Sequence, residues 1–116
     1  MALAFGLTGC VQQGATEAEK HATLRAWISC VRQAADQLDD GRSDPVSIAF
    51  GIEPVCAGLY GQFTEAVVAS VTTEDAMSDL RRLYASQELP LIATVVLIRR
   101  AKEAPPPAAE PVSDKL

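Results

Sequence analysis

The chain has 116 residues with a net charge of −5, and 48% of the residues are hydrophobic and 22% charged. This length suits a single domain, and the composition allows a modest core. The ten Lys and Arg residues are scattered rather than gathered into a basic stripe, which argues against a nucleic-acid binder. The longest apolar run, 89–98, contains Pro90 and is much shorter than the roughly 20 residues of a membrane-spanning helix.

Two short segments precede the first helical pattern. Residues 1–9 are apolar or small and carry no charge, whereas residues 10–16 (CVQQGAT) are mostly polar and contain a glycine. We interpret 1–9 as the remnant of a signal-peptide-like apolar segment and 10–16 as a tether. The helical domain is expected over 17–103.

A first helix is predicted from Thr16, which is suited to the N-cap, with Glu17 and Glu19 in the first turn. The apolar residues that follow share one face of a helix, at spacings of three and four: Leu24, Trp27, Ile28, Val31, Ala34, Ala35 and Leu38. The helix should end in the stretch LDDG, with Gly41 just after the cap.

A second helix is expected to begin with the Asp-Pro pair at 44–45, a capping residue followed by proline at the first helical position. Pro54 removes one backbone hydrogen bond and should kink or split this helix near Phe50. Gly58 and Gly61 indicate either a close approach of two helices or a break. The predicted apolar face consists of Ile48, Ile52, Val55, Leu59, Phe63 and Ala66.

A third helix is predicted from Thr73 and should end before Pro90, because the residue preceding a proline is pushed out of helical geometry. Residues 91–98 could form a strand or a helix. Their β-branched residues favour a strand, but no partner strand is evident, so we predict a short buried fourth helix ending near Glu103. The apolar face of the third helix consists of Ala76, Met77, Leu80, Leu83 and Tyr84.

Two arginine pairs, 81–82 and 99–100, should then lie in the C-terminal halves of helices, where positive charge complements the helix dipole. Residues 104–116 contain four prolines and are predicted to be a disordered tail, acting as a spacer, as a docking segment or, as we favour, passively. The expected fold is all-α: a small antiparallel bundle of three to four helices with a disordered Pro-rich C-terminal tail.

The sequence contains no recognisable catalytic or ligand-binding motif. Its single histidine, His21, lacks the second histidine of an HExxH metal site, and no Gly-rich phosphate loop occurs. The acidic pair Asp39-Asp40 fits a loop better than a catalytic dyad. We therefore expect no enzyme activity, metal, cofactor, small-molecule substrate or nucleic-acid partner.

The three cysteines are more informative. Cys30 and Cys56 lie about equally far from the predicted turn at 40–45, so they would be level on neighbouring antiparallel helices and could form a disulfide. The alternative is two buried thiols in a reducing compartment. In an exported protein the odd count leaves Cys10 to be explained.

The stretch Leu7-Thr8-Gly9-Cys10 resembles the lipobox of bacterial lipoproteins, in which an apolar residue and two small residues precede the cysteine. The resemblance implies that Cys10 is lipidated and becomes the new N-terminus. It covers only the first ten or so residues, and the rest of the domain resembles no characterised family. In that family an Asp after the cysteine favours the inner membrane, so Val11 implies the outer membrane.

The segment before Cys10 departs from a complete signal peptide, since it holds no Lys or Arg and is short. We expect the true start to lie upstream of Met1; the alternative is a chance match. The sequence thus predicts a small lipid-anchored envelope protein on the periplasmic face of the outer membrane. Its role would be structural or that of an interaction module with a protein partner in the envelope. The alternative is a cytosolic helical partner-binding module with reduced cysteines.

Overall fold

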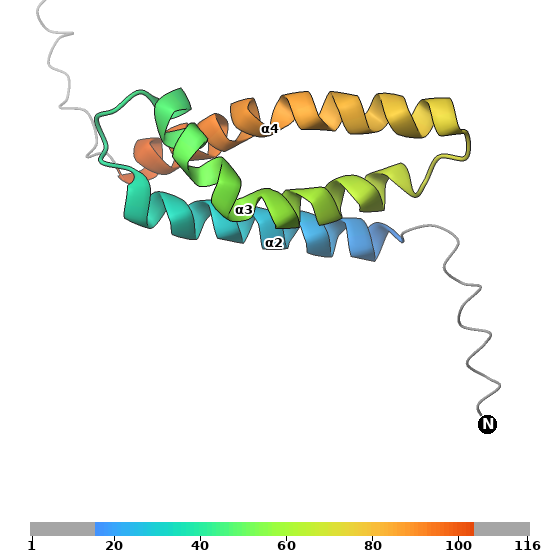
Figure 1. Ribbon diagram of the computed structural model, residues 1–116. Helices are drawn as coiled ribbons and strands as arrows, with labels where there is room; N and C mark the ends of the chain where they lie inside the picture. The colour runs from blue at the N-terminus through green and yellow to red at the C-terminus, as the bar shows by residue number, and fades with distance from the viewer. Residues whose placement is uncertain (1–15, 104–116) are drawn as a thin grey trace, which may run out of the picture.

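The computed structural model describes residues 16–103, which form three helices: α2 (Glu17–Leu38), α3 (Pro45–Val68) and α4 (Glu74–Glu103). The chain runs along α2, returns along α3 and reverses again along α4 (Figure 1). The predicted all-helical class is confirmed for this stretch, which contains no strand. The predictions on the apolar segment 1–9, on all but the last residue of the tether and on the tail 104–116 lie outside the described residues.

Both ends of α2 are fixed by local hydrogen bonds. At the start, Thr16 Oγ1 accepts from the Glu19 amide and Glu19 Oε1 accepts from the Thr16 amide, each at 3.0 Å, which is the predicted N-cap extended to a full capping box. At the other end Asp39 is the C-cap, and Gly41 adopts a φ of 76° two residues later. Only glycine tolerates that backbone conformation without strain.

The buried face of α2 matches the prediction except at its last turn. Trp27, Val31 and the two alanines that follow are buried, and Leu24 and Ile28 pack at the edge of the core. Leu38, the final residue of the helix, is instead 45% exposed and lies near Gly51 of α3 at the edge of the contact between the two helices.

Helix α3 runs unbroken from Pro45 to Val68, although it contains Pro54 and two glycines. Figure 1 shows that its first turns point in a different direction from the rest, so the predicted kink is confirmed. A Cβ atom added at Gly58 or Gly61 would meet no other atom within 4 Å. These glycines therefore mark neither a close approach of helices nor a break, and both alternatives were wrong.

The predicted apolar face of α3 was partly wrong. Val55 is 63% exposed, and beyond Ile52 the buried positions are Cys56, Tyr60, Thr64 and Val68. These residues recur at every fourth position, and each such step drifts about 40° around a helix of 3.6 residues per turn. The drift turns the buried surface gradually around α3, which contacts both of the other helices.

Helix α4 is one helix of 30 residues rather than two, so the predicted end before Pro90 was wrong. Proline deprives one carbonyl of its intrahelical partner, but the buried residues beyond it, Ile92, Ala93 and Val96, hold the second half of the helix on the core. The helix accommodates the proline by bending at its middle (Figure 1). Residues 91–98 are thus helical, as predicted.

The two arginine pairs both lie on α4, at different distances from its ends. Because α4 continues through Pro90, the pair at 81–82 lies in the first third of the helix and not in a C-terminal half. Arg81 instead forms a bidentate pair with Glu65 of α3, with Nε to Oε2 at 2.9 Å and Nη2 to Oε1 at 3.0 Å. The pair at 99–100 does lie near the end of α4.

A line of aromatic rings joins the three helices. Trp27 of α2 packs on Tyr60 of α3 with ring centroids 4.9 Å apart, and Phe63 links Tyr60 to Tyr84 of α4. The Tyr60 hydroxyl also donates to the carbonyl oxygen of Tyr84 at 2.6 Å. Helix α3 thus packs against both neighbours, whereas α2 and α4 contact each other far less.

Candidate functional site

The two cysteines of the helical domain lie level on α2 and α3, as predicted. The Cα atoms of Cys30 and Cys56 are 5.9 Å apart and their sulfur atoms are at disulfide distance. Cys56 is fully buried in the core, and Cys30 lies at its edge. The predicted lipidation site, Cys10, lies outside the described residues.

A network of ion pairs ties the end of α4 to the end of α2. The side chain of Asp39 is only 1% exposed and accepts from Arg100 Nη2 at 2.5 Å, from Arg99 Nη1 at 3.4 Å and from the Gly41 amide at 2.9 Å. The hydrogen bonds from Arg100 hold the pKa of Asp39 below its usual value. Arg100 also donates to the carbonyl of Ser43, so one guanidinium fixes both α2 and the loop that follows it.

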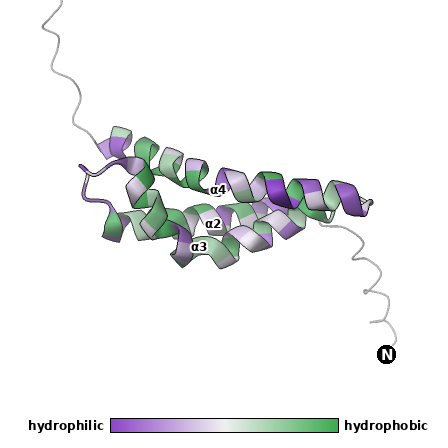
Figure 2. Cartoon of the chain, turned by 45° about the horizontal axis from the view of Figure 1, so that its top comes forward, coloured by the Kyte–Doolittle hydropathy of each residue, from purple (hydrophilic) through white to green (hydrophobic). Residues whose placement is uncertain are grey.

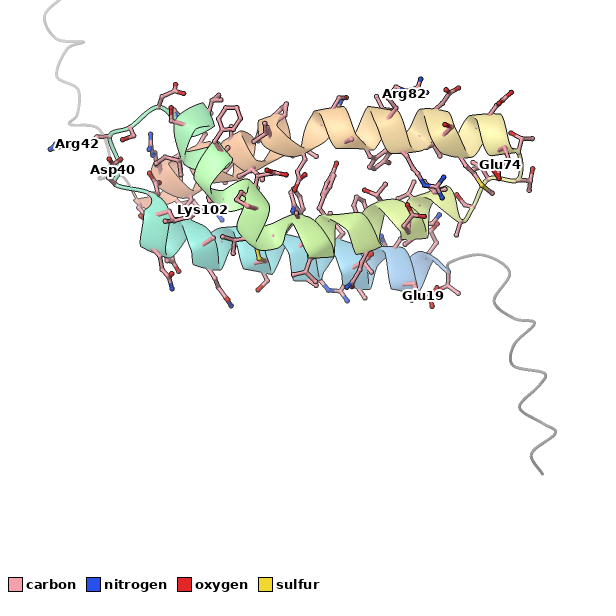
Figure 3. The ribbon with its side chains drawn as sticks, viewed as in Figure 1. Glu19, Asp40, Arg42, Glu74, Arg82 and Lys102 are labelled. Atoms are coloured by element: carbon pink, nitrogen blue, oxygen red, sulfur yellow. A yellow bond between two sulfur atoms is a disulfide. The ribbon has the colours of Figure 1, made fainter. Side chains whose placement is uncertain are left out.

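The second residue of the acidic pair belongs to that loop, as expected. Asp40 accepts from the amides of Arg42 and Ser43 at 2.8 and 2.7 Å and from the Ser43 hydroxyl at 2.6 Å. Figure 3 shows Asp40 and Arg42 at the end of the molecule, on the loop between α2 and α3. These contacts are those of a side chain that shapes a turn by binding the backbone two and three residues on.

A groove of about 430 Å³ lies between α2 and the last turns of α4. Its apolar side chains are Ile28, Val95 and Ile98, and Arg32 and Lys102 are basic side chains that form no ion pair among residues 16–103. The remaining charges compensate one another, because Arg99 donates to Asp36 at 2.6 Å and lies near Glu103. In Figure 2 the C-terminal half of α4 is mostly hydrophobic, whereas the N-terminal half carries most of its hydrophilic colour.

The carboxyl group of Glu88 is buried between α3 and α4. Glu88 is 9% exposed, and its Oε2 atom has no hydrogen-bond partner among residues 16–103. Burial, together with the nearby charge of Glu53 and a hydrogen bond to it, raises the pKa of Glu88 to about 7. The indole Nε1 of the buried Trp27 is likewise unpartnered within this stretch.

His21 is exposed on α2. Across residues 16–103, no three His, Cys, Asp or Glu side chains gather closely enough to bind a metal ion. None of the three helices is long and apolar enough to cross a membrane. Comparison of the chain with protein-family models, with curated proteins and with solved structures finds no match.

Neither the groove nor the buried carboxyl group of Glu88 was predicted from the sequence. The groove could have been predicted from Val95, Ile98 and Lys102, which recur at helical spacing once the helix is allowed to pass Pro90. Nothing in the local pattern singles out Glu88, which stands in a polar stretch before the proline. Its burial depends on the packing of α4 against α3, where Glu53 lies near it.

Proposed function

We propose that the protein is a small lipid-anchored envelope protein, attached through Cys10 to the periplasmic face of the outer membrane. Residues 10–16 would tether an antiparallel three-helix bundle that serves as a structural or protein-interaction module, and the Pro-rich residues 104–116 would follow it as a tail. The proposal assigns the domain no catalytic activity. Its partner would be another protein of the envelope.

The position of Cys30 against Cys56 is the observation that carries this proposal. Disulfides persist in oxidising compartments such as the periplasm and are rare in the cytosol. A bond between these two cysteines uses two of the three thiols and leaves Cys10 alone. That remaining cysteine is the one in the lipobox-like stretch. The cysteine pair of the helices therefore supports the periplasm as the compartment, and the stretch around Cys10 independently supports a lipid anchor.

The anchor would be strong enough to retain the protein. A diacylglyceryl group supplies two long acyl chains, and each buried methylene contributes about 0.8 kcal/mol. Release into water would therefore be negligible, and the helical domain itself would not need to enter the bilayer. The groove between α2 and α4 gives the anchored domain a surface on which a partner could bind.

Intact-mass measurement of the protein purified from native membranes tests the proposal. We expect a chain that starts at Cys10, carries a diacylglyceryl group and is lighter by the two hydrogen atoms lost when Cys30 and Cys56 are oxidised to a disulfide. The matched control is Cys10→Ser, which should remain unprocessed or become soluble while Cys30 and Cys56 still pair. An unmodified mass from Met1 to Leu116 with three reduced thiols would overturn the proposal in favour of a cytosolic module.

A further inference from the structure

The groove between α2 and α4 is the open side of the bundle. Ile98 is 51% exposed within it, and Leu91, two turns earlier on the same face of α4, is 39% exposed. Ile28 of α2 provides the facing wall. A row of exposed apolar side chains along a helix is typical of a surface that contacts another segment.

The charges beside this groove are unusual for so acidic a chain. Among residues 16–103, most cations pair with a carboxylate, and four do not: Arg25, Arg32, Arg42 and Lys102. Arg42 lies on the loop (Figure 3), but Arg32 and Lys102 line the groove and Arg25 lines its continuation along α2. The unpaired positive charge of the domain is thus concentrated along one side of the bundle, and it favours an acidic occupant.

The chain itself provides a segment with the required chemistry at the required place. Residues 104–116 follow directly from Glu103, which lines the groove at the end of α4. They contain two acidic residues, Glu110 and Asp114, with Val112 between them, and one basic residue, Lys115. Their prolines restrict the unbound chain, which lowers the entropy cost of ordering it on a surface.

The lengths agree with such a contact. Glu110 follows Glu103 by seven positions, a stretch that spans up to about 22 Å in the polyproline conformation and is long enough to turn back over the end of α4. Glu110 and Asp114 are then about 12 Å apart, and Arg32 and Arg25 are about 10 Å apart along α2. The long arginine side chains can absorb the difference.

We propose that residues 104–116 fold back into the groove between α2 and α4. Glu110 pairs with Arg32 and Asp114 pairs with Arg25. Val112 covers the apolar surface at Ile28. The groove is then occupied by the chain's own C-terminal segment, and another protein reaches it only by displacing that segment.

A spin label tests this proposal on the full chain, in the Cys10→Ser background so that lipidation plays no part. A nitroxide attached at Ser113→Cys should strongly broaden the methyl resonances of Ile28, Val95 and Ile98 relative to the reduced label. Leu83, which is exposed on the N-terminal half of α4, should keep its intensity and serves as the internal control. Equal intensities at Ile98 and Leu83 would overturn the proposal.

Charge reversal separates specific docking from a chance encounter. The Glu110→Lys/Asp114→Lys variant changes only residues outside the described bundle and should abolish the broadening without altering the circular dichroism spectrum. Adding Arg25→Glu and Arg32→Glu to that variant should restore the broadening. Broadening that survives the first reversal would refute the assigned pairs, and broadening that disappears on dilution would place the segment of a second copy in the groove.

Discussion

Arg100 and Asp39, separated by 61 positions in the chain, meet in a bidentate ion pair that closes one end of the bundle. Arg100 Nε lies 3.1 Å from both carboxylate oxygens, and the carboxylate is almost fully buried. The pair joins the last turn of α4 to the residue that caps α2. The Arg100 guanidinium also donates to the carbonyl oxygen of Ser43, so this ion pair fixes the loop between α2 and α3 as well.

Replacing Asp39 should therefore destabilise the domain markedly. Asp39→Ala leaves two guanidinium groups without their buried acceptor and frees the Gly41 amide, so we expect a loss of about 2–3 kcal/mol in the free energy of unfolding. The control is Asp36→Ala, which removes a carboxylate that is 64% exposed and should cost less than about 1 kcal/mol. Urea unfolding followed by circular dichroism measures both, and equal losses would contradict the role assigned to Asp39.

Reduction of the bond between Cys30 and Cys56 should lower the stability of the domain. The two residues are 26 positions apart, and closing a loop of that length contributes about 3.5 kcal/mol in the chain-entropy model. Thermal unfolding with and without a reductant should show a clear decrease in the midpoint. A Cys30→Ser/Cys56→Ser variant should give the reduced value under both conditions. Two thiols that react with an alkylating agent in denatured, unreduced protein would disprove the bond.

The buried Glu88 predicts a pH dependence that is opposite to that of an ordinary ion-paired carboxylate. Its pKa is about 7 in the folded domain against 4.5 as the ordinary value, so the folded state binds the proton more tightly. The stability that Glu88 contributes is complete below about pH 4.5, falls as the pH rises and is lost above about pH 7. The direction follows from linkage, because the folded domain releases this proton only at a higher pH than the unfolded chain does.

Glu88→Gln isolates this contribution, because glutamine keeps the shape of the side chain and cannot ionise. We expect the variant to be more stable than the parent at pH 8 and to differ little from it at pH 4.5. Asp39 and Glu65, whose pKa values are lowered by Arg100 and Arg81, act in both proteins alike and remove stability only as the pH falls further. A constant difference between the two melting curves from pH 4.5 to 8 would rule out the titration of Glu88.

The two glycines of α3 should be replaceable with a gain in stability. Alanine at position 58 or 61 meets open space, and a helix interior favours alanine over glycine by about 0.5–1 kcal/mol. Gly58→Ala and Gly61→Ala should each raise the unfolding midpoint. Gly41→Ala is the contrasting variant, since its φ of 76° strains any residue with a Cβ, and it should lower the midpoint. A decrease in all three would mean that α3 needs its glycines for a contact beyond this chain.

The helix starts were predictable because they depend on local chemistry. Thr16 and Asp44 cap their helices through side-chain hydrogen bonds with residues two or three positions away. The level placement of Cys30 and Cys56 also followed from helical rise on either side of one turn. The caps depend on residues within a few positions of each other, and the level of the two cysteines depends only on the fixed rise per residue of a helix.

What could not be predicted depends on contacts between helices. Local rules end a helix before Pro90, but the burial of Ile92 and Val96 against the core outweighs the lost hydrogen bond. The same holds for the buried face of α3, where Tyr60 and Thr64 are enclosed although more apolar residues such as Val55 lie on the same helix and are exposed. The groove and the environment of Glu88 both follow from the path of α4, and the sequence pattern at Pro90 predicted that path incorrectly.

The position of the disulfide also determines how the domain comes apart. The bond joins α2 to α3, whereas α4 has no such covalent link and is held by the short connection after Val68, by side-chain packing and by ion pairs such as Arg100–Asp39 and Arg81–Glu65. Local opening should therefore release α4 as a unit and leave a covalently closed helical hairpin. Amide hydrogens of α4 should exchange with solvent sooner than those near Cys30 and Cys56, and a protease should cut first in the segment between Val68 and Glu74.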